Sequence, residues 1–428
     1  MLLTHSPHTP PLSPESAKAL RWQGPRPLPL HLAMEGLTLQ MCFAGLTPWS
    51  VGSPLSKPIE QAIEEATGGS LDGEAWSEKI DPTLFLSALT RAGQDKLATF
   101  AAGVAAYQSH DHHRTVPTPD RWAEAAALPV LDYGGAQDGR PVLVVPSLIN
   151  KAYVLDLFED RSFMRALATR GFSPYLLDWT NAKHFDAEND IDSYIESLVI
   201  PALESIKRRH GQPAVLVGYC MGGTLTTAPA VLRPDLVSAL VLLAAPWDFH
   251  ADSEGLRHWL AVSRSGLEAT IDSLGQAPVD LVQSLFAGLD PTLVGRKFRS
   301  FAAMDPDSDG AKRFVVLEDW LNDGVPLAGP VARTCLLDWY LDNATLKQEW
   351  RVGSKAIRPQ DITCPTLAVI PSRDRIVPPR SAESLAELVP GATVQSVALG
   401  HIGMMAGGRA AKEVYEPVAD WIINAASQ

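Results

Sequence analysis

One cysteine stands in a setting that suits a nucleophile. The string Gly218-Tyr219-Cys220-Met221-Gly222-Gly223 directly follows the apolar run Ala214-Val215-Leu216-Val217. Small residues two positions either side of a central side chain are typical of a sharp turn from strand to helix that exposes that side chain. A thiol there suits thioester chemistry, because an acyl group passes from one sulfur to another with little change in free energy. The alternative is an ordinary turn with a buried core cysteine.

A carboxylate follows a later strand-like segment. Leu367-Ala368-Val369-Ile370 is a short apolar run, and Asp374 lies in the proline-bearing loop after it. The acid of a catalytic triad occupies such a loop when it lies between nucleophile and histidine in the chain. Asp374 could instead only cap a helix that begins near Ser381, and Asp248, after the preceding strand, is the second candidate for the acid.

A single histidine follows His258 in the chain, and this residue is His401. It lies after the strand-like run Val394-Gln395-Ser396-Val397. After it comes a segment with Val414, Val418, Trp421 and Ile422 on one face, which predicts an amphipathic C-terminal helix. The loop between last strand and last helix is where a general base is expected.

Together these residues predict a thiol-based triad. Free cysteine has a pKa of about 8.5, so little thiolate exists at neutral pH without help. His401 would accept the proton of Cys220, and Asp374 would hold the imidazole in the productive tautomer. The backbone N–H of Met221 and one from the loop around Ile149 are the candidate donors to an oxyanion. The alternative for the Ile149 loop is an ordinary turn between strand and helix.

Strand and helix patterns alternate around these residues. Strands are expected at 141–145, 174–177 and 239–245, and helices at 161–170 and 191–209. This alternation predicts a mostly parallel sheet with helices on both faces. With the order cysteine, aspartate, histidine it indicates an α/β fold of the α/β-hydrolase type.

Longer stretches of the chain resemble polyhydroxyalkanoate synthases. These stretches are residues 143–157, with Asn150 and Lys151, the cysteine turn, residues 374–379 and residues 400–403. The resemblance covers about residues 130–428. It implies an acyltransferase that polymerises (R)-3-hydroxyacyl-CoA and releases CoA, with Cys220 acylated, His401 as base and Asp374 as its partner. It also implies a homodimer formed through a cap, and CoA as part of the substrate in place of any separate cofactor.

Two departures from that family leave other functions open. Many of these synthases have histidine directly after the catalytic aspartate, where this chain has Arg375. The chain length also differs from both the long single-subunit synthases and the subunits that need a partner protein. One alternative is a hydrolase: a depolymerase, a thioesterase or an esterase similar to dienelactone hydrolase. The other is a non-catalytic protein of this fold that binds polyester granules.

Three regions are predicted along the chain. Residues 1–30 are proline-rich and suggest a flexible arm, and residues 31–125 suggest a helical N-terminal region. Residues 126–428 form the expected α/β-hydrolase domain. About 120 residues separate the strands at 239–245 and 367–370, so a helical cap insertion is expected at about 250–350.

Composition excludes several classes of function. The net charge of −13 over 428 residues lacks the basic footprint of a nucleic-acid-binding protein. No run of about 18 apolar residues predicts a membrane span, and no secretory signal is expected. The four cysteines have irregular spacing, which fits free thiols in a cytoplasmic protein. Location at cytoplasmic polyester granules is a further expectation, and no metal site is expected.

Overall fold

A computed structural model describes residues 18–19, 21–43, 82–122, 128–136, 138–179, 189–252 and 254–425. The chain forms two compact units, one of residues 1–13, 114–289 and 323–428, the other of residues 14–113 and 290–322. Most of the predicted arm, residues 1–17 and 20, lies outside the described residues. Residues 290–322 of the predicted cap group with the N-terminal helices, and the predicted domain limits stay a prediction.

A seven-stranded sheet forms the centre of the first unit. Its order is β1-β5-β2-β6-β7-β12-β13, with β1 antiparallel to β5 and every other neighbouring pair parallel. The strands are β1 (Val130–Asp132), β2 (Pro141–Val145), β5 (Ser173–Leu177), β6 (Ala214–Tyr219), β7 (Val237–Leu243), β12 (Thr366–Pro371) and β13 (Thr393–Val397). The predicted mostly parallel α/β sheet is confirmed.

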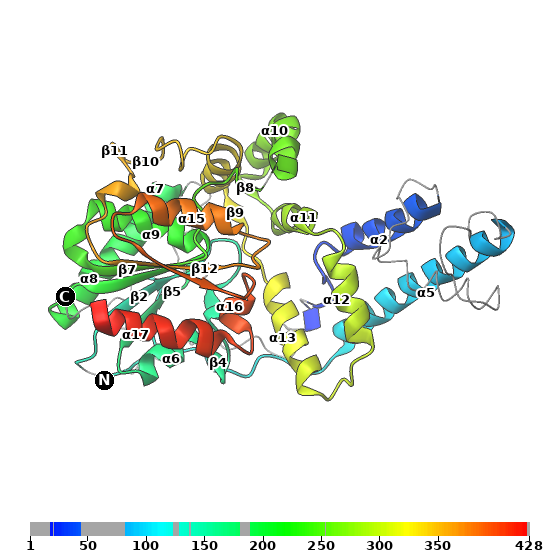
Figure 1. Ribbon diagram of the computed structural model, residues 1–428, viewed down its shortest axis with the longest axis horizontal. Helices are drawn as coiled ribbons and strands as arrows, with labels where there is room; N and C mark the ends of the chain where they lie inside the picture. Colours follow the sequence, from blue (N-terminus) through cyan, green and yellow to red (C-terminus); the bar gives the residue numbers. More distant parts are fainter. Residues whose placement is uncertain are drawn as a thin grey trace, which may run out of the picture. The chain divides into compact units, whose positions relative to one another are not determined.

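Helices cover both faces of this sheet. Helices α9 (Met221–Leu232) and α15 (Pro379–Leu388) lie on one face, and α6 (Phe163–Thr169) and α17 (Glu416–Ala425) lie on the other (Figure 1). The predicted helix at 191–209 is α7 (Ile191–Tyr194), the π-helical turn η4 (Ile195–Val199) and α8 (Ile200–His210). Shorter elements of this unit are η2 (Ala152–Leu155), β3 (Asp156–Phe158), β4 (Arg161–Ser162), η5 (Pro234–Leu236), η7 (Pro359–Asp361), α16 (Gly403–Ala406) and η8 (Ala411–Tyr415).

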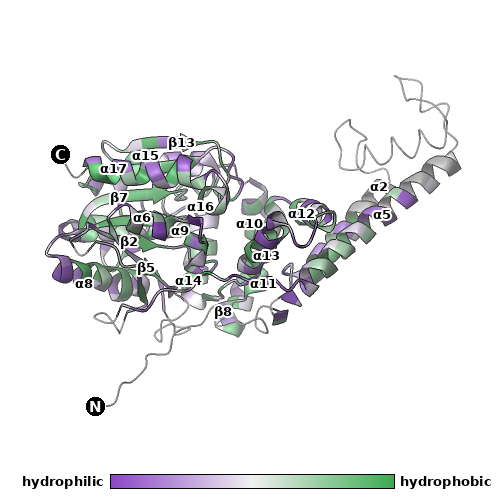
Figure 2. Cartoon of the chain, turned by 90° about the horizontal axis from the view of Figure 1, so that it is seen from below, coloured by the Kyte–Doolittle hydropathy of each residue, from purple (hydrophilic) through white to green (hydrophobic). Residues whose placement is uncertain are grey.

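The central strands are apolar because helices cover both their faces. Every residue of β2, β6 and β12 is buried, whereas the edge strand β13 is mostly exposed. A strand buried on both faces needs a continuous apolar sequence, and Figure 2 shows β2 and β7 as predominantly hydrophobic. The sheet therefore gives a rigid edge from which loops can present polar groups.

A long insertion separates β7 from β12. It begins with α10 (Glu254–Leu274) and α11 (Val279–Leu289), both within the predicted helical insertion. After residues 290–322 it returns to the first unit with α14 (Gly329–Arg333) and the π-helical turn η6 (Thr334–Leu341). Two small hairpins complete it, β8 (Gln276–Ala277) with β9 (Leu327–Ala328), and β10 (Arg351–Val352) with β11 (Lys355–Ala356).

The second unit is helical. It contains α2 (Leu28–Phe43), α5 (Pro82–Ser109), α12 (Leu293–Ala302) and α13 (Asp309–Asn322), and its core includes Phe100, Phe298 and Phe301. Arg21, 1% exposed, donates to the two carboxylate oxygens of Asp319 at 2.7 and 2.6 Å. Because both oxygens are paired, neither charge is left uncompensated in the interior. Across the described part of both units, no helix is long and apolar enough to cross a bilayer.

The turn from β6 to α9 brings backbones into very close approach. A Cβ added to Gly222 would lie 2.1 Å from the Val145 carbonyl oxygen, and one on Gly218 would lie 2.4 Å from the Gly223 Cα. A Cβ on Gly223 would lie 2.3 Å from that of Ala245. Because real contacts are never this short, a larger residue at any of these places displaces backbone.

We expect Gly222→Ala to lower the free energy of unfolding by about 1–3 kcal/mol, because its methyl group has no space beside β2. Gly255→Ala, in α10, is the matched control, since no atom lies within 4 Å of its added methyl group. It should change stability by less than about 1 kcal/mol, towards greater stability. Urea denaturation followed by fluorescence measures both, and equal effects would contradict the close-packing argument.

Candidate active site

The three predicted triad residues follow three strands of one sheet. Cys220 comes directly after β6, Asp374 lies in the loop after β12, and His401 follows β13. These strands are parallel, so their carboxyl ends lie at the same edge of the sheet. The fold thus brings together residues that lie 27 to 181 positions apart in the chain.

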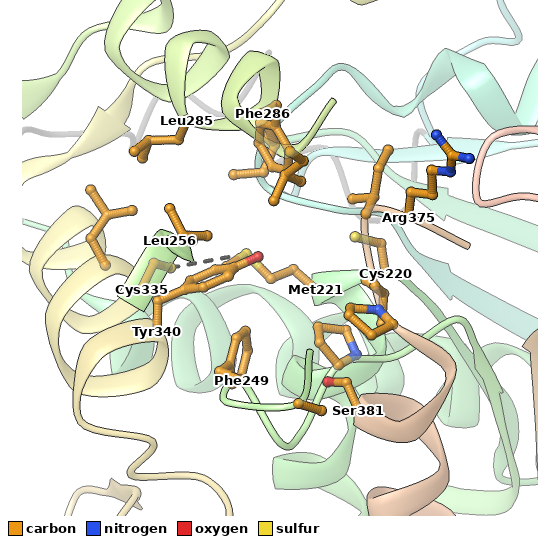
Figure 3. A pocket seen from close by; sticks show the side chains of 18 of the residues that line it. Cys220, Met221, Phe249, Leu256, Leu285, Phe286, Cys335, Tyr340, Arg375 and Ser381 are labelled. Carbon is orange, nitrogen blue, oxygen red and sulfur yellow. Dashed lines mark hydrogen bonds between the residues drawn. The ribbon is translucent and has the colours of Figure 1, made fainter. Parts of the chain in front are cut away.

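Cys220 occupies a strained backbone conformation. Its φ is 56° and its ψ −129°, a region that residues with a side chain seldom adopt. The conformation is held on both sides, because the Cys220 N–H donates to the Leu243 carbonyl at 2.8 Å and its own carbonyl accepts from Gly223 at 2.8 Å. The side chain is half-buried and lines a pocket (Figure 3).

Asp374 and His401 form a buried pair. The Nδ1–H of His401 donates to Oδ2 of Asp374 at 2.6 Å. The other carboxylate oxygen accepts from the backbone N–H groups of Ile376 and Val377, at 2.8 and 2.9 Å. These bonds fix the carboxylate, which in turn fixes the imidazole tautomer with Nε2 available. The alternative acid, Asp248, instead accepts from the Asn343 side chain at 2.8 Å and the His250 N–H at 2.9 Å.

The charges around His401 favour its protonated form. Burial by itself lowers the pKa of this imidazole, but the electrostatic interactions with Cys220 and Asp374 and the hydrogen bond to Asp374 outweigh it and raise the pKa to about 10. The Tyr219 hydroxyl also donates to the His401 carbonyl at 3.2 Å, which holds the loop against β6. A proton transferred from the thiol is therefore stabilised on the imidazole.

The two predicted oxyanion donors lie beside Cys220. Met221 is the first residue of α9, so its N–H has no acceptor within the helix. Ile149 lines the same pocket, and its N–H donates to Oγ of Ser147 at 3.3 Å. That long bond would have to give way before Ile149 could donate to a substrate oxygen, so its role stays a prediction, as does that of Met221.

The Asn150-Lys151 segment, singled out in the sequence, ties the Ile149 loop to the insertion. The Val325 N–H donates to the Ile149 carbonyl at 3.0 Å, and Asn150 forms an isolated antiparallel bridge with Gly324. The Lys151 ammonium lies 2.7 Å from Oδ1 of Asp323. We call residues 149–151 and 323–325 the loop latch. It was not predicted, because the path of the insertion is not encoded in local sequence patterns.

The pocket over Cys220 is mainly apolar, and the insertion provides most of its wall. Its insertion residues include Leu256, Leu260, Val282, Leu285, Phe286, Leu289, Leu327, Leu336 and Tyr340. Arg375, which replaces the histidine of many synthases, also lines it (Figure 3). The sequence analysis did not identify Tyr340, although this residue lies within the predicted insertion at about 250–350. No group of three or more His, Cys, Asp or Glu residues suited to a metal occurs among the described residues.

Comparison with known proteins agrees with this architecture. The model of the α/β-hydrolase fold family matches residues 140–407. The poly(3-hydroxyalkanoate) polymerase subunit PhaC of Allochromatium vinosum is 31% identical over 294 residues, which cover 67% of this chain and 82% of that protein. The chain belongs to the poly(3-hydroxyalkanoate) polymerase family.

Other similarities to this polymerase-family chain differ in extent. PhaC of Haloferax mediterranei is 31% identical over 286 residues, which cover 66% of this chain and 58% of that protein. Among solved structures, a monoacylglycerol lipase from Paleococcus ferrophilus covers 69% of this chain and 98% of its own, with 17% identity and a TM-score of 0.46. The matches to the two PhaC proteins thus extend over 294 and 286 residues, well beyond the segments that contain the triad.

Replacing His401 tests the proton transfer from Cys220. At pH 7.5, His401→Gln should slow alkylation of Cys220 by iodoacetamide about ten- to thirtyfold, because the thiol loses its proton acceptor. Because the pKa of His401 is raised to about 10 in the folded protein, protonation of this imidazole should stabilise the fold below its ordinary pKa, and this contribution should be lost as the pH rises through about 10. Peptide mass mapping measures the alkylation.

Cys364 provides an internal control in the same digest. Burial raises the pKa of its thiol to about 11, so its alkylation should stay slow and equal in both proteins. An unchanged alkylation rate at Cys220 would contradict the role of His401.

Replacing the acid tests which carboxylate orients His401. Asp374→Asn should slow acylation of Cys220 by about a hundredfold or more, because an amide no longer fixes the required tautomer. Asp248→Asn, a change of equal size at the other candidate, should retain the rate within a few fold. Stopped reactions analysed by intact mass measure both rates, and the opposite ranking would assign the acid role to Asp248.

Proposed function

We propose that this protein polymerises 3-hydroxyacyl groups taken from CoA thioesters, with Cys220 as the residue that carries the acyl chain. One observation carries the proposal: the thiol of a family member lies in a strained turn beside a buried histidine–aspartate pair. A thiol is suited to this task because it accepts an acyl group from the sulfur of CoA and passes it on to an oxygen.

The first proposed step is acylation of Cys220. Nε2 of His401 takes the thiol proton, and the thiolate attacks the thioester carbonyl carbon of the substrate. The N–H groups of Met221 and Ile149 stabilise the oxyanion of the tetrahedral intermediate. Its collapse breaks the bond to the CoA sulfur, which leaves with the proton held by His401. CoA enters only as part of the substrate, and no separate cofactor takes part.

The second proposed step is transfer to a hydroxyl group. The 3-hydroxyl of a second 3-hydroxyacyl group gives its proton to His401 and attacks the acyl carbon bound to Cys220. An ester bond forms, the thioester bond breaks, and the Cys220 sulfur leaves as the thiolate. Water in place of that hydroxyl would give hydrolysis. The apolar wall of the pocket supports polymerisation over hydrolysis, because it disfavours water beside the acyl group and favours a hydrocarbon chain.

Further proposals concern assembly and location. We propose a homodimer formed through the cap, and action at the surface of polyester granules in the cytoplasm. Both proposals come from membership of the polymerase family. We propose no nucleic-acid partner, because a net charge of −13 would repel the phosphate backbone.

The decisive assay supplies 3-hydroxybutyryl-CoA and follows free CoA, soluble acid and insoluble polymer. We expect CoA and polymer, with an acyl adduct on Cys220 by intact mass. Cys220→Ala should abolish the adduct and at least about 99% of CoA release, because it removes the nucleophile. Cys220→Ser should retain a small residual rate, because the hydroxyl still occupies the turn but is a weaker nucleophile.

Two outcomes would contradict the proposal. Monomeric acid in place of polymer would assign a thioesterase, one of the hydrolase alternatives. CoA release by Cys220→Ala equal to that of the unaltered protein would exclude the thiol chemistry altogether. Cys364→Ala, which removes a thiol outside the pocket residues, is the control and should leave both products unchanged.

A further inference from the structure

Tyr340 is one of the polar residues that the insertion adds to the mainly apolar pocket. Tyr340 lies in the π-helical turn η6, and its ring packs edge-on against Phe249, with the ring centres 4.7 Å apart. Figure 3 shows the ring between Phe249 and Leu256, with the hydroxyl directed to the side of the pocket that holds Met221 and Cys220. The phenol group is thus held by its ring and presents its oxygen to the space beside the nucleophile.

The Tyr340 hydroxyl forms no hydrogen bond with any residue in the described part of the chain. Burial raises the pKa of this phenol, and interactions with the acidic groups around it raise it further. The group therefore keeps its proton and acts as a hydrogen-bond donor. The residue is only partly buried and its hydroxyl borders the pocket, so the donor is available to a ligand oxygen placed there.

The acyl substrate of the proposed function has one polar atom that fits this donor. A 3-hydroxyacyl group carries its thioester at C1 and one oxygen at C3, and the rest is hydrocarbon. In the proposed mechanism, the thioester oxygen accepts hydrogen bonds from the N–H groups at the start of α9 and in the Ile149 loop. The C3 oxygen then needs a donor in a wall lined largely by apolar side chains, and Tyr340 offers one there, beside the polar side chains of Arg375 and Ser381.

We propose that the Tyr340 hydroxyl donates a hydrogen bond to the C3 oxygen of the acyl group bound at Cys220, and so selects 3-hydroxyacyl substrates over plain acyl substrates. This inference rests on the proposed function. Because Tyr340 donates and the C3 oxygen accepts, the contact survives when that oxygen becomes part of an ester. The same residue thus holds both the first acyl unit and the growing chain in one orientation.

Tyr340→Phe tests the contact, since it removes the hydroxyl and keeps the ring. The two substrates are 3-hydroxybutyryl-CoA and butyryl-CoA, which lacks the C3 oxygen but can still acylate Cys220 and release CoA. We expect kcat/KM for CoA release from 3-hydroxybutyryl-CoA to fall about tenfold, as for loss of one hydrogen bond. The rate constant for acylation of Cys220 by butyryl-CoA should stay unchanged, which also shows that the variant is folded.

Tyr133→Phe is the matched control. Its hydroxyl donates to Asp156 at 3.3 Å, and it is not one of the pocket residues, so neither constant should change. Equal shifts of both constants in Tyr340→Phe would overturn the inference, and so would no shift in either. If the unaltered protein releases no CoA from 3-hydroxybutyryl-CoA, the proposed function fails first, and the inference falls with it.

Discussion

The close approach of three backbone segments at the β6–α9 turn is the constraint on which the site depends. Glycine at positions 218, 222 and 223 leaves just enough space for β2, the helix and the segment after β7 to meet. With no space for adjustment, Cys220 is fixed at a positive φ and its side chain points out of the turn. The nucleophile thus has one position, and the other groups are arranged around it.

Electrostatic interactions then determine whether the imidazole of His401, next to that nucleophile, carries a proton. A buried imidazole would ordinarily stay neutral, because charge is costly away from water. The interactions with Cys220 and Asp374 reverse that preference at His401, and backbone donors keep the carboxylate of Asp374 in place. The proposed chemistry needs this reversal, because the imidazole must hold a proton between attack and departure of CoA.

The sequence predicted the parts of the site that depend on the sheet. Cys220, Asp374 and His401 could be found because each comes after an apolar strand, and the loops after parallel strands meet at a shared edge. Tyr340 and Asp323 could not be found in this way. They lie in the insertion, whose path over the sheet depends on packing between segments far apart in the chain. The helices at 290–322 likewise group with the N-terminal helices, a pairing that no local pattern reveals.

The loop latch has a consequence for control of the reaction. Asp323 is the first residue after the segment of the insertion that belongs to the second unit. It holds Lys151, two residues from the backbone proposed to receive the developing negative charge. A change in the path of the chain at Asp323 would therefore act on the Ile149 loop through the Lys151 ion pair and the Val325–Ile149 hydrogen bond, without passing through the hydrophobic core.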